Sequence, residues 1–335
     1  MQGRGGYPLK VRLGYVAMSV HVQNASPSKT MTYAQFSKIS DREAALRKLE
    51  QIASENLHNT LRLLKHNRYS GIQLYRFSSR LIPLHTHEAL KDWEPMKALL
   101  PQFKEIGDFV KKHQMRVSFH PDHYTVLSTP RKDVLQKSIQ DLQRHADMLD
   151  AMGLGLEATC NIHVGGMYGD REKAMARFIE QFEAMDERIK QRMTLENDDK
   201  TFTASETLTA CEQLAVPMVL DLHHHRVNPS DEDLAELWPR IRDTWNPNQR
   251  LAGNVNVPPK IHISSPKSAK DPRSHADYVD PEDLFPFLAA AADGTPAIDV
   301  MIEAKKKDDA LFRLMEHAKT MSNVRVLTQA SFEIG

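Results

Sequence analysis

Short apolar runs alternate with longer amphipathic segments along most of the chain. Eight apolar runs predict β-strands at 11–18, 72–77, 115–119, 158–164, 192–196, 216–221, 259–264 and 297–303. Apolar residues recur at helical spacing over 42–66, 103–113, 133–152, 171–188, 204–213, 230–243, 280–292 and 308–321. Strand–helix alternation repeated eight times predicts a (β/α)8 barrel, the TIM barrel. An open doubly wound sheet is the alternative, and the absence of a GxGxxG motif after the first predicted strand disfavours it.

Length and composition fit this architecture and narrow the function classes. The 335 residues suit one domain over 1–335, with a core at about 11–321 and short irregular tails. Lys+Arg and Asp+Glu both number 44, so a nucleic-acid partner would need a local basic patch. The chain has no long apolar run and no signal-peptide pattern, which predicts no membrane segment. Two cysteines, Cys160 and Cys211, form no disulfide framework, so we expect an intracellular, cytoplasmic protein.

Six consecutive predicted strands carry metal-competent side chains near their carboxyl ends. These side chains are His120, His163, Glu196, Asp221, the pair Lys260 and His262, and Glu303. Barrel enzymes build their active sites at this end of the strands, so we expect the side chains to converge there. Any one of them more often caps a helix or makes a core hydrogen bond, but six together favour a metal site.

The mixture of carboxylates and imidazoles suits manganese, zinc, iron or cobalt, and the number of candidates indicates two or three ions. Such a centre supports hydrolysis of a phosphoester, and it equally supports sugar isomerisation. The residues alone do not separate these two activities. A non-enzymatic DNA-binding module is a third hypothesis, which is weaker because it needs no ligands at six strand ends.

Eight stretches, taken in order, resemble the UV damage endonuclease family. They are LGYVAMS, YRFSSRLIPL, SFHPDHY, NIHVGGMYGD, LENDD, DLHHHRVNP, PKIHISSP and MIEAK. The similarity runs from about Val11 to His317. The resemblance implies a metal-dependent TIM barrel, distantly similar to endonuclease IV and xylose isomerase. It implies nicking of damaged double-stranded DNA immediately 5′ of UV photoproducts, and of some other lesions including abasic sites, leaving 3′-hydroxyl and 5′-phosphate ends.

The resemblance also implies a ligand set and catalytic roles. The implied metal ligands, with manganese foremost and zinc or cobalt as alternatives, are His120, His163, Glu196, Asp221, His224, His262, His275 and Glu303. Lys260 matches a lysine that the family can carry as a carbamate, and otherwise we expect it to pair with Glu303 or Asp221. Catalytic roles fall on Glu196, Asp221, Lys260 and Glu303.

For the stretch DLHHHRVNP at 221–229, the strand pattern and the family resemblance predict different ligands. On a straight strand, alternation places Asp221, His223 and His225 on one face. The resemblance instead selects Asp221 and His224. This choice requires the strand to end at about Asp221 and His224 to reach back over the barrel mouth, which leaves His223 and His225 to orient the ligands.

Contacts with damaged DNA are implied in the same way. His123 and Tyr124 match residues that the family inserts into the duplex at a lesion, and Tyr15 matches a residue at the groove. The alternative for Tyr124 is a core aromatic residue. Candidates for phosphate contacts are Lys29, Arg80, Lys267, Lys270 and Arg273.

The motif HPDH at 120–123 departs from the family, in which HPGQ is common. The change alters hydrogen bonding and charge at the site of insertion, and it affects the expected lesion range more than the chemistry. We expect a monomer that acts on DNA in the cytoplasm, associated with the nucleoid.

Overall fold

The computed structural model describes residues 8–253 and 255–335. Within them, a closed barrel forms from the parallel strands β1 (Leu9–Val16), β2 (Leu74–Arg76), β3 (Arg116–Phe119), β4 (Thr159–His163), β5 (Met193–Glu196), β6 (Met218–Asp221), β7 (Lys260–Ile263) and β10 (Ala297–Ile302). Each strand pairs with the next in this order, and β10 returns to pair with β1. All eight predicted strands are present, and the predicted TIM barrel is confirmed.

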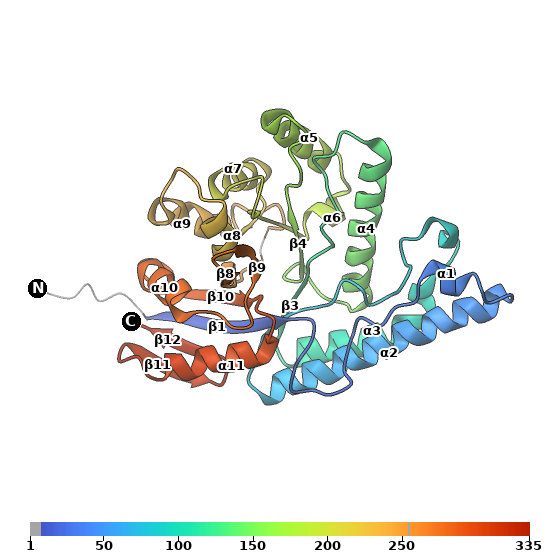
Figure 1. Ribbon diagram of the computed structural model, residues 1–335, viewed down its shortest axis with the longest axis horizontal. Coiled ribbons are helices and arrows are strands. Elements are labelled where there is room, and N and C mark those ends of the chain that lie inside the picture. Colours follow the sequence, from blue (N-terminus) through green and yellow to red (C-terminus); the bar gives the residue numbers. More distant parts are fainter. Residues whose placement is uncertain (1–7, 254) are drawn as a thin grey trace, which may run out of the picture.

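Helices cover the outside of the barrel (Figure 1). They are α1 (Tyr33–Phe36), α2 (Arg42–Tyr69), α3 (Pro95–Lys112), α4 (Lys132–Ala151), α5 (Arg171–Glu183), α6 (Glu187–Lys190), α7 (Ala204–Leu214), α8 (Leu222–Val227), α9 (Leu234–Asp243), α10 (Phe285–Ala291) and α11 (Lys307–Ala318). The predicted helix at 171–188 divides into α5 and α6, and α1 and α8 were not predicted. No described helix is long and apolar enough to cross a membrane.

The C-terminal tail is ordered, so the prediction that it is irregular was wrong. Residues beyond 321 form the strands β11 (Val324–Thr328) and β12 (Ser331–Ile334), and β12 pairs antiparallel with Leu9–Arg12 of β1. The short strand β2 pairs only with Gly14–Val16 of β1, which leaves the first half of β1 with an open edge. The tail covers that edge and satisfies its backbone groups. Residues 1–7 of the predicted N-terminal tail lie outside the described residues.

The interior of the barrel is unusually polar, whereas TIM barrels usually fill it with branched apolar side chains. At the amino ends of the strands, Asp299 accepts hydrogen bonds from Arg12 Nε (2.7 Å) and Arg116 Nη1 (2.6 Å). Asp299 is fully buried and Arg116 is nearly so. This ion network closes the amino end, and the candidate site lies at the opposite end.

Candidate metal centre

Parallel pairing brings the predicted ligands side by side at the carboxyl ends of the strands. His163 lies opposite Glu196, and Asp221 lies opposite His262. Two groups of ligand atoms result, each with all atoms within 4.8 Å of one another: His120, His163 and Glu196 in one, and Glu196, Asp221, His262 and Glu303 in the other. Glu196 belongs to both groups, so the structure joins six predicted ligands into one continuous cluster.

Two buried atoms at the centre of the cluster lack hydrogen bonds. His262 Nδ1 lies 3.1 Å from Glu196 Oε2 and 3.0 Å from Glu303 Oε1, but without hydrogen-bond geometry. Asp221 Oδ2 also has no hydrogen-bond partner among the described residues. Buried polar atoms are costly unless they are partnered. Three carboxylates and an imidazole that converge with unpartnered atoms are typical of a metal site, so the residues present fit a divalent metal.

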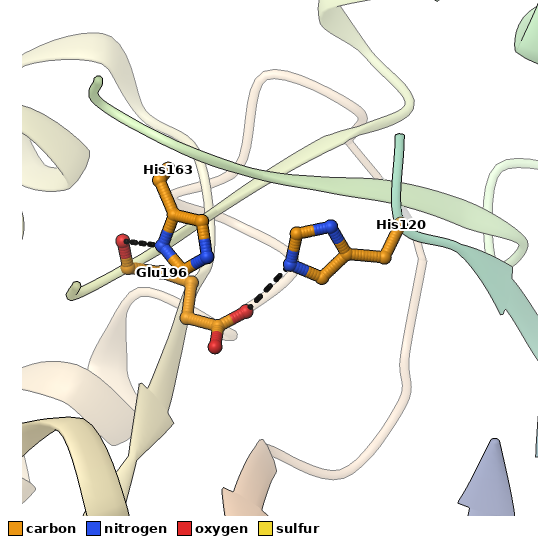
Figure 2. A group of neighbouring side chains, drawn as sticks. All are labelled: His120, His163 and Glu196. Atoms are coloured by element: carbon orange, nitrogen blue, oxygen red, sulfur yellow. Dashed lines mark hydrogen bonds and ion pairs between the residues drawn. The ribbon is translucent and has the colours of Figure 1, made fainter. Parts of the chain in front are cut away.

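Backbone carbonyls orient four of the predicted histidine ligands. In each ring Nδ1 donates its hydrogen to a backbone carbonyl oxygen, which fixes the ring and leaves Nε2 as the nitrogen available to a metal. The bonds are His120 to Pro121 (2.9 Å), His163 to Glu196 (3.3 Å), His224 to Asn197 (2.9 Å) and His275 to Glu303 (2.7 Å). Figure 2 shows His163 held in this way while His120 Nε2 approaches the Glu196 carboxylate, at 3.2 Å.

The carboxylates stay ionised although they are buried. Burial alone would raise the pKa of Glu196, but the charges of His262 and His163 outweigh it and hold this pKa well below its usual range. Burial likewise opposes ionisation of Glu303, and Arg76 and His262 reverse the effect, lowering the pKa of Glu303. Burial lowers the pKa of His262, but Glu196 and Glu303 more than compensate and raise it to about 9. The cluster therefore presents ionised carboxylates where a cation would bind.

Lys260 lies inside the barrel below this cluster. Its Nζ donates to Ser118 Oγ at 3.1 Å, so the prediction that it pairs with Glu303 or Asp221 was wrong. Burial and the charge of Arg116 lower the pKa of Lys260 well below its ordinary value. A lysine in this environment has access to the neutral amine, which carboxylation requires.

The chain leaves β-geometry directly after Asp221, as the resemblance required. Strand β6 ends at Asp221 and helix α8 begins at Leu222, with the Asp221 carboxylate accepting from the backbone N–H of His224 at 2.7 Å. The helical turn carries His224 back over the barrel, where Nδ1 lies 3.4 Å from Glu196 Oε1. The straight-strand alternative is wrong because Asp221 caps a helix.

The two neighbouring histidines have different surroundings. His223 is buried, and its Nε2 donates to the backbone oxygen of Arg273 at 3.2 Å. Arg273 belongs to β9 (Asp271–His275), which pairs with β8 (Pro266–Ser268). His223 is therefore hydrogen-bonded to the hairpin that carries His275. His225 Nδ1 is buried without a hydrogen-bond partner among the described residues.

Of the three residues expected to contact damaged DNA, two are exposed and one is buried. His123 has 74% of its side chain exposed and Tyr124 is 76% exposed, and their ring centroids lie 4.1 Å apart. Tyr124 is therefore not a core aromatic residue. Tyr15 is fully buried and donates its hydroxyl to Asn67 Oδ1 at 2.7 Å. The assignment of Tyr15 to DNA contact is wrong, because it packs in the core against Tyr75.

The predicted phosphate-contact residues lie on loops after β1, β2 and β7, at the same end as the cluster. Lys270 is exposed, and the other four form surface ion pairs: Lys29 with Glu55, Arg80 with Asp122 (3.5 Å), Lys267 with Asp271 (3.6 Å) and Arg273 with Asp199 (3.7 Å). Surface pairs are weak, at about 0–1 kcal/mol each, so phosphates can compete for these cations.

Sequence reasoning missed two residues that contact the cluster. Arg76 ends β2 and pairs with Glu303, and Asn161 on β4 donates from its side chain to Glu196. Arg76 had a detectable signal, since it is a charged residue inside the apolar run IQLYRF. Asn161 had none beyond its position two residues before His163.

Fold and cluster together define a TIM-barrel protein with a candidate multi-metal centre at the carboxyl face. Within that class, the family model described as UV-endonuclease UvdE matches residues 11–334, and the chain belongs to this family. It is 42% identical over 326 residues to the UV DNA damage endonuclease of Halalkalibacterium halodurans, covering 97% of this chain and 99% of that protein. The Bacillus velezensis UV DNA damage endonuclease is 43% identical over 317 residues, covering 94% and 96%.

Solved structures agree with this placement. The crystal structure of SacUVDE superposes with a TM-score of 0.79 and 29% identity, covering 92% of this chain and 98% of that one. Endonuclease IV from Thermus thermophilus gives a TM-score of 0.52 at 11% identity, covering 91% and 98%. At that identity the second likeness concerns the fold alone.

Proposed function

We propose that the protein is a metal-dependent endonuclease that nicks double-stranded DNA immediately 5′ of UV photoproducts and of abasic sites, leaving 3′-hydroxyl and 5′-phosphate ends. Membership of the family supports UV DNA damage endonuclease activity and a DNA substrate. The observation that carries the metal dependence is Glu196, a buried carboxylate shared by two adjoining groups of metal-competent atoms.

The proposed centre holds two or three divalent ions, with manganese foremost and zinc or cobalt as alternatives. Its ligands are His120, His163, Glu196, Asp221, His224, His262, His275 and Glu303, with a carboxylated Lys260 as a further anionic ligand. When bound, such ions lower the pKa of water and stabilise the charge on the reacting phosphate and its leaving oxygen.

The chain's own residues prepare this reaction. Arg76 and Asn161 fix the carboxylates of Glu303 and Glu196, so the anionic groups need little rearrangement when the substrate arrives. The backbone carbonyls fix the rotation of the imidazole rings. A cluster positioned in this way would hold the ions at the barrel mouth, where the scissile phosphate would bind.

Selection of damage rests on the exposed pair His123 and Tyr124. Inserting these rings into a duplex costs a few kcal/mol per unstacked step, and a lesion that already weakens stacking reduces the cost. Asp122 Oδ1 lies 2.8 Å from His123 Nδ1 and Asp122 Oδ2 lies 3.5 Å from Arg80 Nη2, so two neighbouring side chains partner its charge beside the phosphate path. The pair therefore selects weakened stacking without reading sequence.

A sugar isomerase or epimerase on the same scaffold is the alternative hypothesis. The metal-competent cluster suits both activities, and the exposed pair of aromatic rings beside basic loops favours DNA over a small sugar. It predicts turnover of a ketose and no nicking of DNA.

The test is incubation of metal-loaded protein with UV-irradiated plasmid and with the same plasmid unirradiated. The expected result is nicking of the irradiated plasmid with manganese, cobalt or magnesium. Nicking no greater than that of the unirradiated control with all three metals would overturn the proposal. End-labelled DNA with one photoproduct then shows whether the cut lies on its 5′ side.

A further inference from the structure

The exposed tip that carries His123 and Tyr124 is short, and buried chain follows it directly. Both rings are largely exposed, whereas Thr125 is only 6% exposed and Leu127 is fully buried. The backbone N–H of Thr125 donates to the carbonyl oxygen of Asp122 at 2.8 Å, which closes a four-residue turn with the two rings at its central positions. The chain therefore passes from exposed to buried within one residue of Tyr124.

Two hydrogen bonds fasten the buried side of this turn to helix α4. The Thr125 hydroxyl donates to Asp141 Oδ2 at 2.6 Å, and the backbone N–H of Val126 donates to Ser138 Oγ at 3.0 Å. The Ser138 hydroxyl in turn donates to the backbone oxygen of Val134 at 2.9 Å, within the same helix. Because a carboxylate is a stronger acceptor than a hydroxyl, the bond from Thr125 to Asp141 is the stronger of the two.

The other side of the turn leads to the candidate metal centre. His120 is one of the predicted ligands, so only residues 121–124 separate the centre from the anchor at Thr125. Within this span, Asp122 pairs with Arg80 at 3.5 Å, a surface contact of the weak kind. The bond to α4 is therefore the main side-chain restraint on where the two rings lie relative to the metal centre.

A tip held in place before binding favours insertion. A flexible tip would lose conformational entropy when its rings entered a duplex, and this loss would add to the cost of unstacking the bases. A tip that already has its bound conformation avoids most of the loss. We infer that Thr125 and Asp141 are positioning residues, which hold the Tyr124 ring in place for insertion at a lesion. This inference rests on the proposed function and deepens it.

The test is a double-mutant cycle between Thr125→Val and Tyr124→Ala. Valine replaces the hydroxyl of Thr125 with a methyl group of similar size, which removes the donor and keeps the shape. The metal-loaded proteins act in single turnover on a duplex containing one thymine photodimer. The quantity compared is the enzyme concentration that gives half-maximal nicking. A bond that only supported the fold would matter equally with and without the Tyr124 ring, so the cycle separates positioning from stability.

Two further variants serve as controls. Thr125→Ser keeps the hydroxyl donor and should nick like wild type. Thr60→Val removes a hydroxyl that is equally buried but far along the chain, in the middle of α2, where it donates to the backbone oxygen of Asn56 at 2.9 Å. This variant loses a buried hydrogen bond without touching the insertion tip, so it should also nick like wild type.

With Tyr124 present, Thr125→Val should raise the concentration for half-maximal nicking about tenfold, because the donor to a carboxylate is lost. In the Tyr124→Ala protein, the same change should raise it no more than about twofold, since the ring to be positioned is gone. Asp141→Ala should repeat the pattern of Thr125→Val, and it provides the comparison if the valine variant fails to fold.

An equal effect of Thr125→Val with and without the Tyr124 ring would overturn the inference while leaving the proposed function intact. So would wild-type nicking by Thr125→Val. Absence of any nicking by the wild-type protein would instead refute the proposed function, and the inference with it.

Discussion

The two ends of the barrel interior are both buried and both charged, yet they are built on opposite principles. At the amino end, the Asp299 carboxylate is neutralised within the chain by the guanidinium groups of Arg12 and Arg116. At the carboxyl end, Glu196 and Glu303 gather around the same histidine, only a few residues further along the strands.

The difference lies in what each end still lacks. The amino end supplies its carboxylate with hydrogen-bond donors from the protein, and it needs nothing more to neutralise that anion. The carboxyl end leaves Asp221 Oδ2 and His262 Nδ1 without hydrogen-bond partners among the described residues, although both are buried. Buried charge alone therefore does not identify a functional site. Converging metal-competent atoms that lack hydrogen-bond partners do identify one, and the following changes test that distinction.

Replacing Glu196 with glutamine should have the largest effect on activity. The change removes the carboxylate charge shared by both ligand groups, and nicking of irradiated plasmid should fall on the order of a thousandfold, since metal ions supply several kcal/mol of charge stabilisation. Glu316→Gln, at an exposed carboxylate on α11, is the matched control and should nick normally. Wild-type nicking by Glu196→Gln in a folded protein would show that the cluster is not the active centre.

Replacing Asp299 with alanine should instead have the largest effect on stability. Two guanidinium groups lose their partner, and removing one side of a buried ion network costs about 3–5 kcal/mol. Urea unfolding measures the loss in free energy of unfolding. Nicking per folded molecule should remain, because Asp299 lies at the far end of the barrel. If unfolding were unchanged while nicking disappeared, the assignment of the two ends would be reversed.

Lys260 lies between the two ends of the barrel interior. Its replacement by alanine tests whether it supports the metal centre or the structural ion network. We expect nicking to fall on the order of a hundredfold, with fewer metal ions bound per chain, as for residues that support a metal centre. Metal content by elemental analysis and nicking should decline together. A fall in stability with full nicking and full metal content would place Lys260 in the structural network.

Tyr124→Ala should have the smallest effect, confined to the choice of substrate. The side chain is 76% exposed, so the free energy of unfolding should change by no more than about 0.5 kcal/mol. The ratio of nicking on irradiated to unirradiated plasmid should drop about tenfold. Without the Tyr124 ring, the enzyme loses the insertion into the duplex, which costs less free energy at a lesion than in intact DNA. An unchanged ratio would remove Tyr124 from lesion recognition.

The barrel and much of the cluster could be predicted because both follow from strand periodicity. Lys260 and His262 are two residues apart on β7 and both are buried inside the barrel, as alternation requires. Asp221 and His224 could not be paired in this way, because a helix begins between them. His275 lies on a hairpin that no apolar pattern marks. Resemblance supplied both histidines, yet it misplaced Tyr15, since a matching position in sequence does not reveal whether a side chain reaches solvent.

The most direct test of the central claim is anomalous scattering from crystals of the protein grown with manganese. We expect anomalous difference peaks among Glu196, Asp221, His262 and Glu303, and beside His120 and His163, with ligand distances of about 2.0–2.3 Å. Glu196→Gln crystals grown in the same way should lose or weaken these peaks. A wild-type map without a peak at the cluster, from protein that nicks irradiated DNA, would contradict the account.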